Sequence, residues 1–105
     1  MKYEKDYIKQ LDERYKSTVD DGLWETWVSM YEVFDPDSDS LVYAVLATRT
    51  FKDGVETYDK GREGKIFTTL EAAQEYFKAK TIGMYKSPEE ELLVMLNCLK
   101  PKEIN

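Results

Sequence analysis

The sequence predicts an α+β fold in which helices pack on an antiparallel meander sheet. Two segments rich in aromatic and β-branched residues follow each other closely, as strands of a meander do; they are Leu23–Phe34 and Leu41–Phe51. The pair Asp53-Gly54 comes next and is typical of a two-residue hairpin with a type I′ turn. Two helix-start patterns then follow the sheet, at Thr68 and Ser87.

The composition indicates one domain that spans residues 1–105. Hydrophobic residues make up 42% of the chain, and a chain of this length can bury a core without a metal or a disulfide. Cys98 is the only cysteine, so an internal disulfide is impossible and a reducing compartment is expected. Because the N-terminus is mixed and charged, we predict a cytoplasmic protein that does not enter a membrane.

The first segment, residues 3–16, is predicted to form a helix. Tyr3, Tyr7, Leu11 and Tyr15 recur every four residues, which places them on one stripe of a helix. Charged residues fill most of the other positions, so the helix would have one apolar side and one solvated side.

The segment that begins at Leu23 has apolar residues on both of its predicted strand faces, so we expect it to be covered on both sides. Asp35–Ser40 is predicted to be a turn, because proline fixes φ and Asp and Ser side chains bond to their own backbone. The following strand is the most apolar and is expected to be central. A third strand is predicted from Val55 to about Lys60, and Lys65–Phe67 is either a short fourth strand or the start of a helix.

Two C-terminal helices are predicted to pack on the sheet. The first begins at Thr68, which forms a capping box with Glu71, and continues to about Lys80. The second begins at Ser87, with proline in its first position. Its apolar residues cover more than one stripe, so we expect this helix to be either deeply buried or one half of an oligomer contact. Cys98 is expected to be a buried, inert thiol.

The chain contains no histidine. Ser-His-Asp and Cys-His catalysis are therefore excluded, and the commonest neutral metal ligand is missing. Asp35, Asp37 and Asp39 are similar to the opening of a calcium-binding loop, but Ser40 and Leu46 stand where that loop needs glycine and glutamate. We predict no metal, no cofactor and no enzymatic activity; a small enzyme that uses tyrosine, lysine or a carboxylate is the remaining alternative.

The negative charge of the chain is concentrated in its first part. Residues 1–40 hold 11 acids and 5 bases, which equals the whole net charge of −6. Ser17–Thr48 contains seven carboxylates and both tryptophans but no lysine or arginine. Such a segment repels nucleic acid and attracts a basic protein surface. The alternative is that these carboxylates form a solvated face that keeps the protein in solution.

The candidate binding site combines these carboxylates with aromatic side chains of the same segment. Tryptophan and tyrosine often anchor binding surfaces, and an acidic rim suits a basic groove. The alternative is that both tryptophans pack in the core. The candidate site residues are Asp20, Asp21, Trp24, Glu25, Trp27, Tyr31, Glu32, Asp35, Asp37 and Asp39.

These observations predict a non-enzymatic, acidic protein-binding module. Its expected partner is the basic surface of a nucleic-acid-handling protein such as a nuclease, where carboxylates take the place of phosphates, and direct binding of nucleic acid is not expected. In size, charge and cytoplasmic character the chain resembles small DNA-mimic inhibitors of phages and mobile elements, including anti-CRISPR proteins. The alternative, from another class, is a structural or assembly protein that forms a homo-oligomer through its C-terminal helix.

Overall fold

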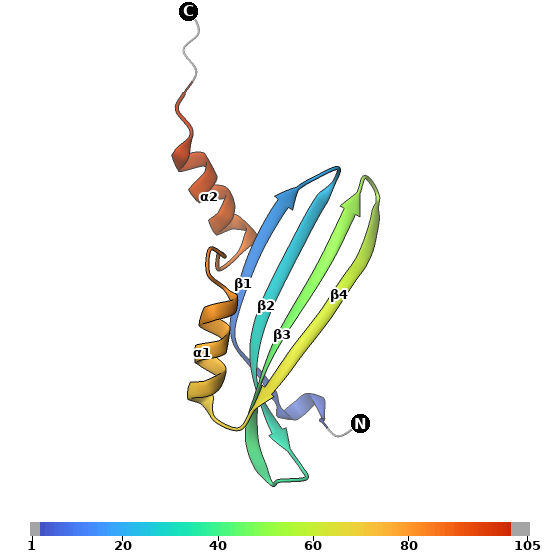
Figure 1. Ribbon diagram of the computed structural model, residues 1–105, viewed down its shortest axis with the longest axis vertical. Helices are drawn as coiled ribbons and strands as arrows, with labels where there is room; N and C mark the ends of the chain where they lie inside the picture. The colour runs from blue at the N-terminus through green and yellow to red at the C-terminus, as the bar shows by residue number, and fades with distance from the viewer. Residues whose placement is uncertain (1–2, 102–105) are drawn as a thin grey trace, which may run out of the picture.

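A computed structural model describes residues 3–101 as four antiparallel strands followed by two helices (Figure 1). The strands form one sheet in the order β1-β2-β3-β4, so each strand pairs with its neighbour in sequence. The molecule is elongated, with extents of 69 × 30 × 22 Å. The predicted α+β meander is confirmed, with four strands. The elements are η1 (Lys5–Tyr7), β1 (Ile8–Val19), β2 (Leu23–Asp35), β3 (Ser40–Asp53), β4 (Glu56–Phe67), α1 (Leu70–Lys80) and α2 (Pro88–Cys98).

The predicted N-terminal helix over residues 3–16 is wrong. Most of this segment belongs to β1, which pairs with β2, and one 3-10 turn, η1, precedes it. A spacing of four residues fits both a helix stripe and one face of a strand, because four is close to one helical turn and is twice the strand repeat. Pairing with β2 decides in favour of the strand. A bulge at Leu11 then shifts the alternation, so Leu11 packs with the core beside α1 whereas Tyr15 lies on the other face, beside Trp27.

The predicted break between the third strand and residues 65–67 is also wrong, because β4 is continuous. It pairs with β3 through both Gly61 and Gly64, with a bulge at the step between Arg49 and Thr50. Gly64 lets the two strands and their side chains approach closely, since a Cβ there would lie 2.4 Å from the Leu46 side chain.

The predicted hairpin between β3 and β4 is present, but its turn lies one residue later. Asp53 pairs with Glu56, so Gly54 and Val55 form the loop. Gly54 has a φ of 63°, and Val55 has a negative φ. A positive φ at the first loop residue alone is the pattern of a type II′ turn rather than the predicted type I′ turn.

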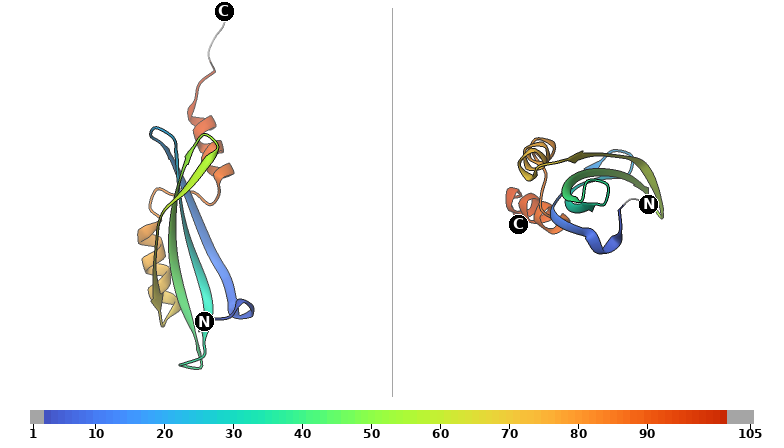
Figure 2. Two further views of the ribbon diagram at one scale, coloured as in Figure 1. Left: turned by 90° about the vertical axis from the view of Figure 1, so that its right-hand side faces the viewer. Right: turned by 90° about the horizontal axis from the view of Figure 1, so that it is seen from below.

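The helix α1 covers one face of the sheet, which we call the α1 face (Figure 2). Ala73 and Phe77 of α1 are buried against a cluster of strand residues, namely Val28, Met30 and Val45. The N-cap is Thr69, one residue later than predicted, and its hydroxyl accepts a hydrogen bond from the backbone N–H of Ala72 at 3.3 Å. The predicted end of the helix at Lys80 is confirmed.

The opposite face of the sheet, which we call the open face, carries a second apolar cluster. Val33, Val42 and Ala44 are buried there, and Tyr3 and Tyr31 pack against them. The central strands β2 and β3 therefore have apolar cores on both faces, as the sequence predicts for β2. Only part of the open face is covered, because large side chains on its edge strands remain about half exposed.

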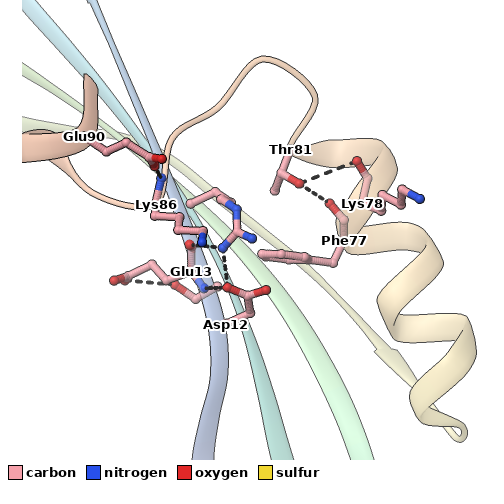
Figure 3. Close-up of polar contacts among 9 residues, drawn as sticks. Asp12, Glu13, Phe77, Lys78, Thr81, Lys86 and Glu90 are labelled. Carbon is pink, nitrogen blue, oxygen red and sulfur yellow. Dashed lines mark hydrogen bonds and ion pairs between the residues drawn. The ribbon is translucent and has the colours of Figure 1, made fainter. Parts of the chain in front are cut away.

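Where the C-terminal end of α1 lies near β1, polar contacts form within each of the two segments (Figure 3). The Phe77 carbonyl accepts two hydrogen bonds from Thr81, one from its hydroxyl at 2.7 Å and one from its backbone N–H at 3.0 Å, and these bonds close the last turn of the helix. The guanidinium of Arg14 lies 5.5 Å from the centre of the Phe77 ring and also donates to the carboxylate of Asp12. In the first turn of α2, the Glu90 carboxylate accepts a hydrogen bond from the backbone N–H of Lys86, which lies in the preceding connection.

The helix α2 is not packed on a face of the sheet, contrary to the prediction for the second C-terminal helix. It begins as predicted, with Ser87 as N-cap and Pro88 in the first position. It contacts β1, the edge strand, and then runs away from the sheet toward the C-terminus (Figure 1). In the part of the chain that the structure describes, no helix is long and apolar enough to cross a membrane.

The core around α1 leads to a prediction on stability. Replacing Phe77 by alanine is expected to lower the free energy of unfolding by about 3–5 kcal/mol, because it leaves a cavity between α1 and the sheet. The control is Val55→Ala in the β3–β4 turn, where the side chain is 100% exposed; it is expected to change stability by less than about 0.5 kcal/mol. Urea denaturation followed by circular dichroism measures both. Equal stabilities of the two variants would contradict this assignment of the core.

Candidate functional site

The acidic residues of the predicted site lie at opposite ends of β2. Asp20 and Asp21 are exposed in the β1–β2 turn, whereas Asp37 and Asp39 are exposed in the β2–β3 turn (Figure 1). β2 has 13 residues, so about 40 Å separates the two turns. The two groups of carboxylates therefore do not form one continuous patch.

The carboxylates along β2 itself face cations of the neighbouring strands. Glu25 lies on the open face and forms an ion pair of 2.9 Å with Lys52 of β3. Glu32 lies on the α1 face, in register with Lys9 of β1. Asp35 is buried at the end of the strand, where its carboxylate accepts hydrogen bonds from the backbone of Asp37 at 3.1 Å and from the Ser38 hydroxyl at 2.9 Å.

The three aromatic residues of the predicted site are partly exposed and already packed within the chain. Trp24 lies on the α1 face, with its ring 4.7 Å from that of Phe51 and beneath the Arg49 guanidinium at 4.5 Å. Trp27 lies on the open face, with its ring 4.6 Å from that of Tyr15. Tyr31 packs against the open-face core. The two tryptophans thus do not form one anchor, because residues three apart on a strand point to opposite faces.

The ten predicted site residues are therefore distributed over two turns and two faces. Trp27, Glu25 and Tyr31 share the open face, and Trp24 and Glu32 share the α1 face. Within residues 3–101, no group of three His, Cys, Asp or Glu side chains converges in a way that could hold a metal ion. The carboxylate of Asp35, the first aspartate of the calcium-like spacing, closes the turn through its hydrogen bonds to Asp37 and Ser38.

A buried polar pair on the open face has perturbed acidity. Tyr15 is 4% exposed, and its hydroxyl donates to the Glu25 carboxylate at 2.6 Å. Burial, and then this hydrogen bond, raise the pKa of Tyr15 above its usual range. The hydrogen bond from Tyr15, together with the nearby Lys52 ammonium, lowers the pKa of Glu25. The pair ties β1, β2 and β3 together and keeps Glu25 ionised.

An exposed apolar surface lies on α2 and was absent from the predicted site. It consists of six large apolar side chains with exposed fractions of 41–70%; we call it the α2 surface, and its residues are Leu92, Leu93, Val94, Met95, Leu96 and Leu99. Cys98 is also exposed, so the prediction of a buried thiol is wrong. The sequence left two alternatives for this helix, deep burial or an oligomer contact. The exposure of its apolar residues contradicts deep burial in the monomer.

Two contacts fix α2 to the edge of the sheet. Tyr85, just before the helix, exchanges two backbone hydrogen bonds with Tyr15 of β1, at 2.6 and 2.8 Å. Glu91, in the first turn of α2, is buried and accepts hydrogen bonds from the backbone N–H of Ser17 at 2.9 Å and from the Ser17 hydroxyl. These bonds use β1 backbone groups that an edge strand otherwise exposes, and they hold the base of α2 while its apolar residues remain in solvent.

Comparison of the chain with protein-family models, with curated proteins and with solved structures finds no match. The geometry of the chain itself therefore carries the functional argument. The sequence contained the relevant signal, namely apolar residues all around the last helix, but periodicity cannot tell a helix that is buried in the monomer from one that is buried by a partner.

The Tyr15–Glu25 pair leads to a prediction on pH dependence. Glu25→Gln is expected to lower the free energy of unfolding by about 1–2 kcal/mol at pH 7, because a charged hydrogen bond becomes a neutral one. The lowered pKa of Glu25 stabilises the fold above the pKa of a glutamate in the unfolded chain, and this contribution is lost as the pH falls through the folded pKa. The difference between wild type and variant should therefore shrink on acidification below about pH 4.5.

Urea denaturation at a series of pH values measures this difference. The matched control is Glu56→Gln, since Glu56 is an exposed carboxylate beside the β3–β4 turn. It should leave the pH profile of stability close to that of the wild type. If Glu25→Gln and Glu56→Gln gave the same profile, the proposed role of the Tyr15–Glu25 hydrogen bond would be refuted.

Proposed function

We propose that this protein is a non-enzymatic protein-binding module that self-associates through α2. The observation that carries the proposal is the exposure of all six members of the α2 surface, on a helix whose one buried residue is the charged Glu91. Buried glutamate and exposed leucine are the reverse of what a helix in a stable monomer shows.

The exposed apolar area argues for a partner. Six side chains of this size that are about half exposed present roughly 400–500 Å² of apolar surface, near the upper limit for the largest patch of a typical monomer. Exposed apolar surface of this extent marks an interaction site. The residues from Leu92 to Leu96 are consecutive and so surround the helix, and a partner on one side would cover about half of them. The segment from Leu92 to Leu96 also contains no charged residue, so the net charge of −6 does not oppose contact there.

A role in binding rather than catalysis also agrees with the use of the polar groups. Tyr15 and Glu25 form the pair with the most perturbed acidity, but Tyr15 is buried and its hydroxyl is engaged by Glu25. The Glu91 carboxylate is engaged by Ser17. These side chains connect strands and anchor a helix, and this structural use accounts for them without a substrate.

Self-association leads to a prediction with a closely matched control. Leu96→Asp is expected to weaken self-association by roughly 30- to 1000-fold, because burying a carboxylate in an apolar contact costs about 2–4 kcal/mol. Asn97→Asp adds the same charge one residue further along the same helix, at an exposed polar position, and is expected to retain wild-type association. Sedimentation equilibrium over a range of concentrations gives the molar mass, which for a single chain is 12.3 kDa.

The salt dependence offers an independent readout of the same proposal. Association driven by apolar burial should be maintained or strengthened by sulfate. A wild-type protein that remains a monomer at high micromolar concentration would end the proposal. Equal weakening by Leu96→Asp and Asn97→Asp would also count against it, since charge rather than apolar contact would then be the cause.

A second candidate function is docking on a basic surface, and the exposure of two acidic turns favours it. Asp20 and Asp21 at one end, and Asp37 and Asp39 at the other, are all exposed. Their separation of about 40 Å corresponds to roughly 12 base pairs of duplex DNA. A long basic channel of a nuclease could contact both turns at once, whereas a compact basic pocket could not. A DNA-mimic inhibitor of this shape would therefore bind its basic partner through the two acidic turns, at two separate points.

The two acidic turns can be tested separately. Asparagine is the suitable replacement, because Asp21 and Asp39 have positive φ, a conformation that asparagine tolerates well. Asp20→Asn/Asp21→Asn and Asp37→Asn/Asp39→Asn are each expected to weaken binding to an immobilised basic nuclease by about 3- to 30-fold at 50 mM salt. Duplex DNA should compete with the wild type. If both double variants bind like the wild type, the acidic turns are solvated faces only.

A further inference from the structure

We infer that α2 of one copy binds in an apolar hollow on the open face of a second copy, and that the exchange is reciprocal. This inference rests on the proposed self-association and names its partner surface. Two unpartnered apolar surfaces occur on one chain, and the arguments below concern their fit, their separation and their chemistry.

The receiving surface is a hollow of about 560 Å³ that extends across all four strands; we call it the sheet groove. Its floor is formed by the buried Val33 and Val42, and its walls include Ile8 of β1, Leu46 of β3 and Ile66 of β4. These three wall residues are 43–55% exposed, although each is fully apolar. Apolar side chains that gather around a hollow in this way form a binding groove rather than scattered surface residues.

The groove cannot receive α2 of its own chain. Glu91 fixes the base of α2 to Ser17, and Ser17 lies nine residues along β1 from Ile8 at the groove. This separation is about 30 Å along the strand. From its base, α2 also runs away from the end of the sheet where β1 begins and the groove lies (Figure 1). A second copy is therefore required to bring α2 and the groove together.

The dimensions of the two surfaces agree. α2 has 11 residues, and a helix of that length is about 16 Å long. Four neighbouring strands, with three spacings between them, measure about 14 Å across. A helix that crosses the strands would thus contact the groove over its full width and place its leucines against Ile8, Leu46 and Ile66.

The chemistry and the area of contact also agree. The α2 surface and the three wall residues are uncharged, and Lys65, which also lines the groove, has its ammonium 5.0 Å from the centre of the Tyr76 ring of α1, on the opposite face. Contact between the two apolar surfaces would therefore not bury an unpaired charge. Because a groove covers about half of the helix circumference, helix and groove together would remove roughly 500 Å² from solvent and a reciprocal pair about 1,000 Å², which is the lower limit for a specific protein–protein interface. A single helix-to-helix contact would bury much less. The reciprocal arrangement is isologous, as expected for a two-fold dimer.

The test is a mixing experiment with two variants of the full chain. The helix variant is Leu96→Asp, and the groove variant is Ile8→Asp/Ile66→Asp, which changes exposed residues of the two edge strands. Each variant alone is expected to associate at least about 30-fold more weakly than the wild type. An equimolar mixture should recover association at least about 10-fold, because the intact helix of one chain can bind the intact groove of the other. Sedimentation equilibrium measures all three samples.

Controls separate the groove from general effects of added charge. Val19→Asp/Thr57→Asp adds two carboxylates at exposed positions of the same edge strands, outside the groove, and should associate like the wild type. Circular dichroism establishes that each variant is folded. If the groove variant unfolds, Ile8→Ser/Ile66→Thr takes its place, since these smaller polar residues suit edge strands, and it should still weaken association at least fivefold.

The outcomes distinguish failure of this inference from failure of the proposed function. If the groove variant associates like the wild type while the helix variant does not, α2 binds elsewhere, for example to another α2; the inference is then overturned and self-association remains. Failure of the folded variants to complement each other in the mixture also overturns it. A monomeric wild type overturns both.

Discussion

The sheet has apolar side chains on both faces, and the chain supplies one helix that covers one of them. β2 and β3 form the centre of this arrangement, with Met30 opposite Val45 on the α1 face and Val33 opposite Val42 on the open face. Burial on both faces makes the β2–β3 register strict, because a slip of one residue would exchange the two cores. It also leaves the open face partly uncovered, and the functional argument begins from this incomplete cover.

The position of α2 follows from the hydrogen bonds of the edge strand. β1 ends the sheet, and its free backbone groups are used by Tyr85 and by the Glu91 carboxylate. These polar contacts hold the base of the helix at the edge strand, from which it runs away from the sheet instead of across a face. A buried carboxylate with two hydrogen bonds is costly to displace, so the apolar remainder of α2 is held in solvent. Exposure of this surface is therefore a consequence of specific bonds.

The acidic segment illustrates how strand geometry disperses a charge that is continuous in sequence. Successive side chains alternate between faces, and a 13-residue strand separates its two flanking turns by about 40 Å. Neighbouring strands then bring cations into register, as Lys52 does for Glu25. Charge that is concentrated in one segment of the sequence is thus divided between two exposed acidic turns. On the strand that joins them, Glu25 pairs with Lys52 and Glu32 lies in register with Lys9.

The features that the sequence predicted correctly are those that depend on local interactions. The turn at residues 35–40, the β3–β4 hairpin and the cap at Ser87 were recognisable because proline, glycine and serine act on their own backbone within a few residues. The first strand was mistaken for a helix, because its four-residue spacing fits both repeats and only pairing with β2 resolves it. The candidate site failed to gather for the same reason: its members were neighbours in sequence, whereas a surface is formed by neighbours in space.

By itself, the sequence determined the α+β class, the meander, the start of α2, the start of α1 to within one residue and the apolar character of α2, since all of these depend on residue type and short-range spacing. The tertiary structure alone decided which apolar residues are covered. The order of strands in the sheet and the bond between Glu91 and Ser17 set where α2 lies. Burial depends on contacts between segments far apart in the chain, so the same leucines that could have formed a core instead form an exposed surface.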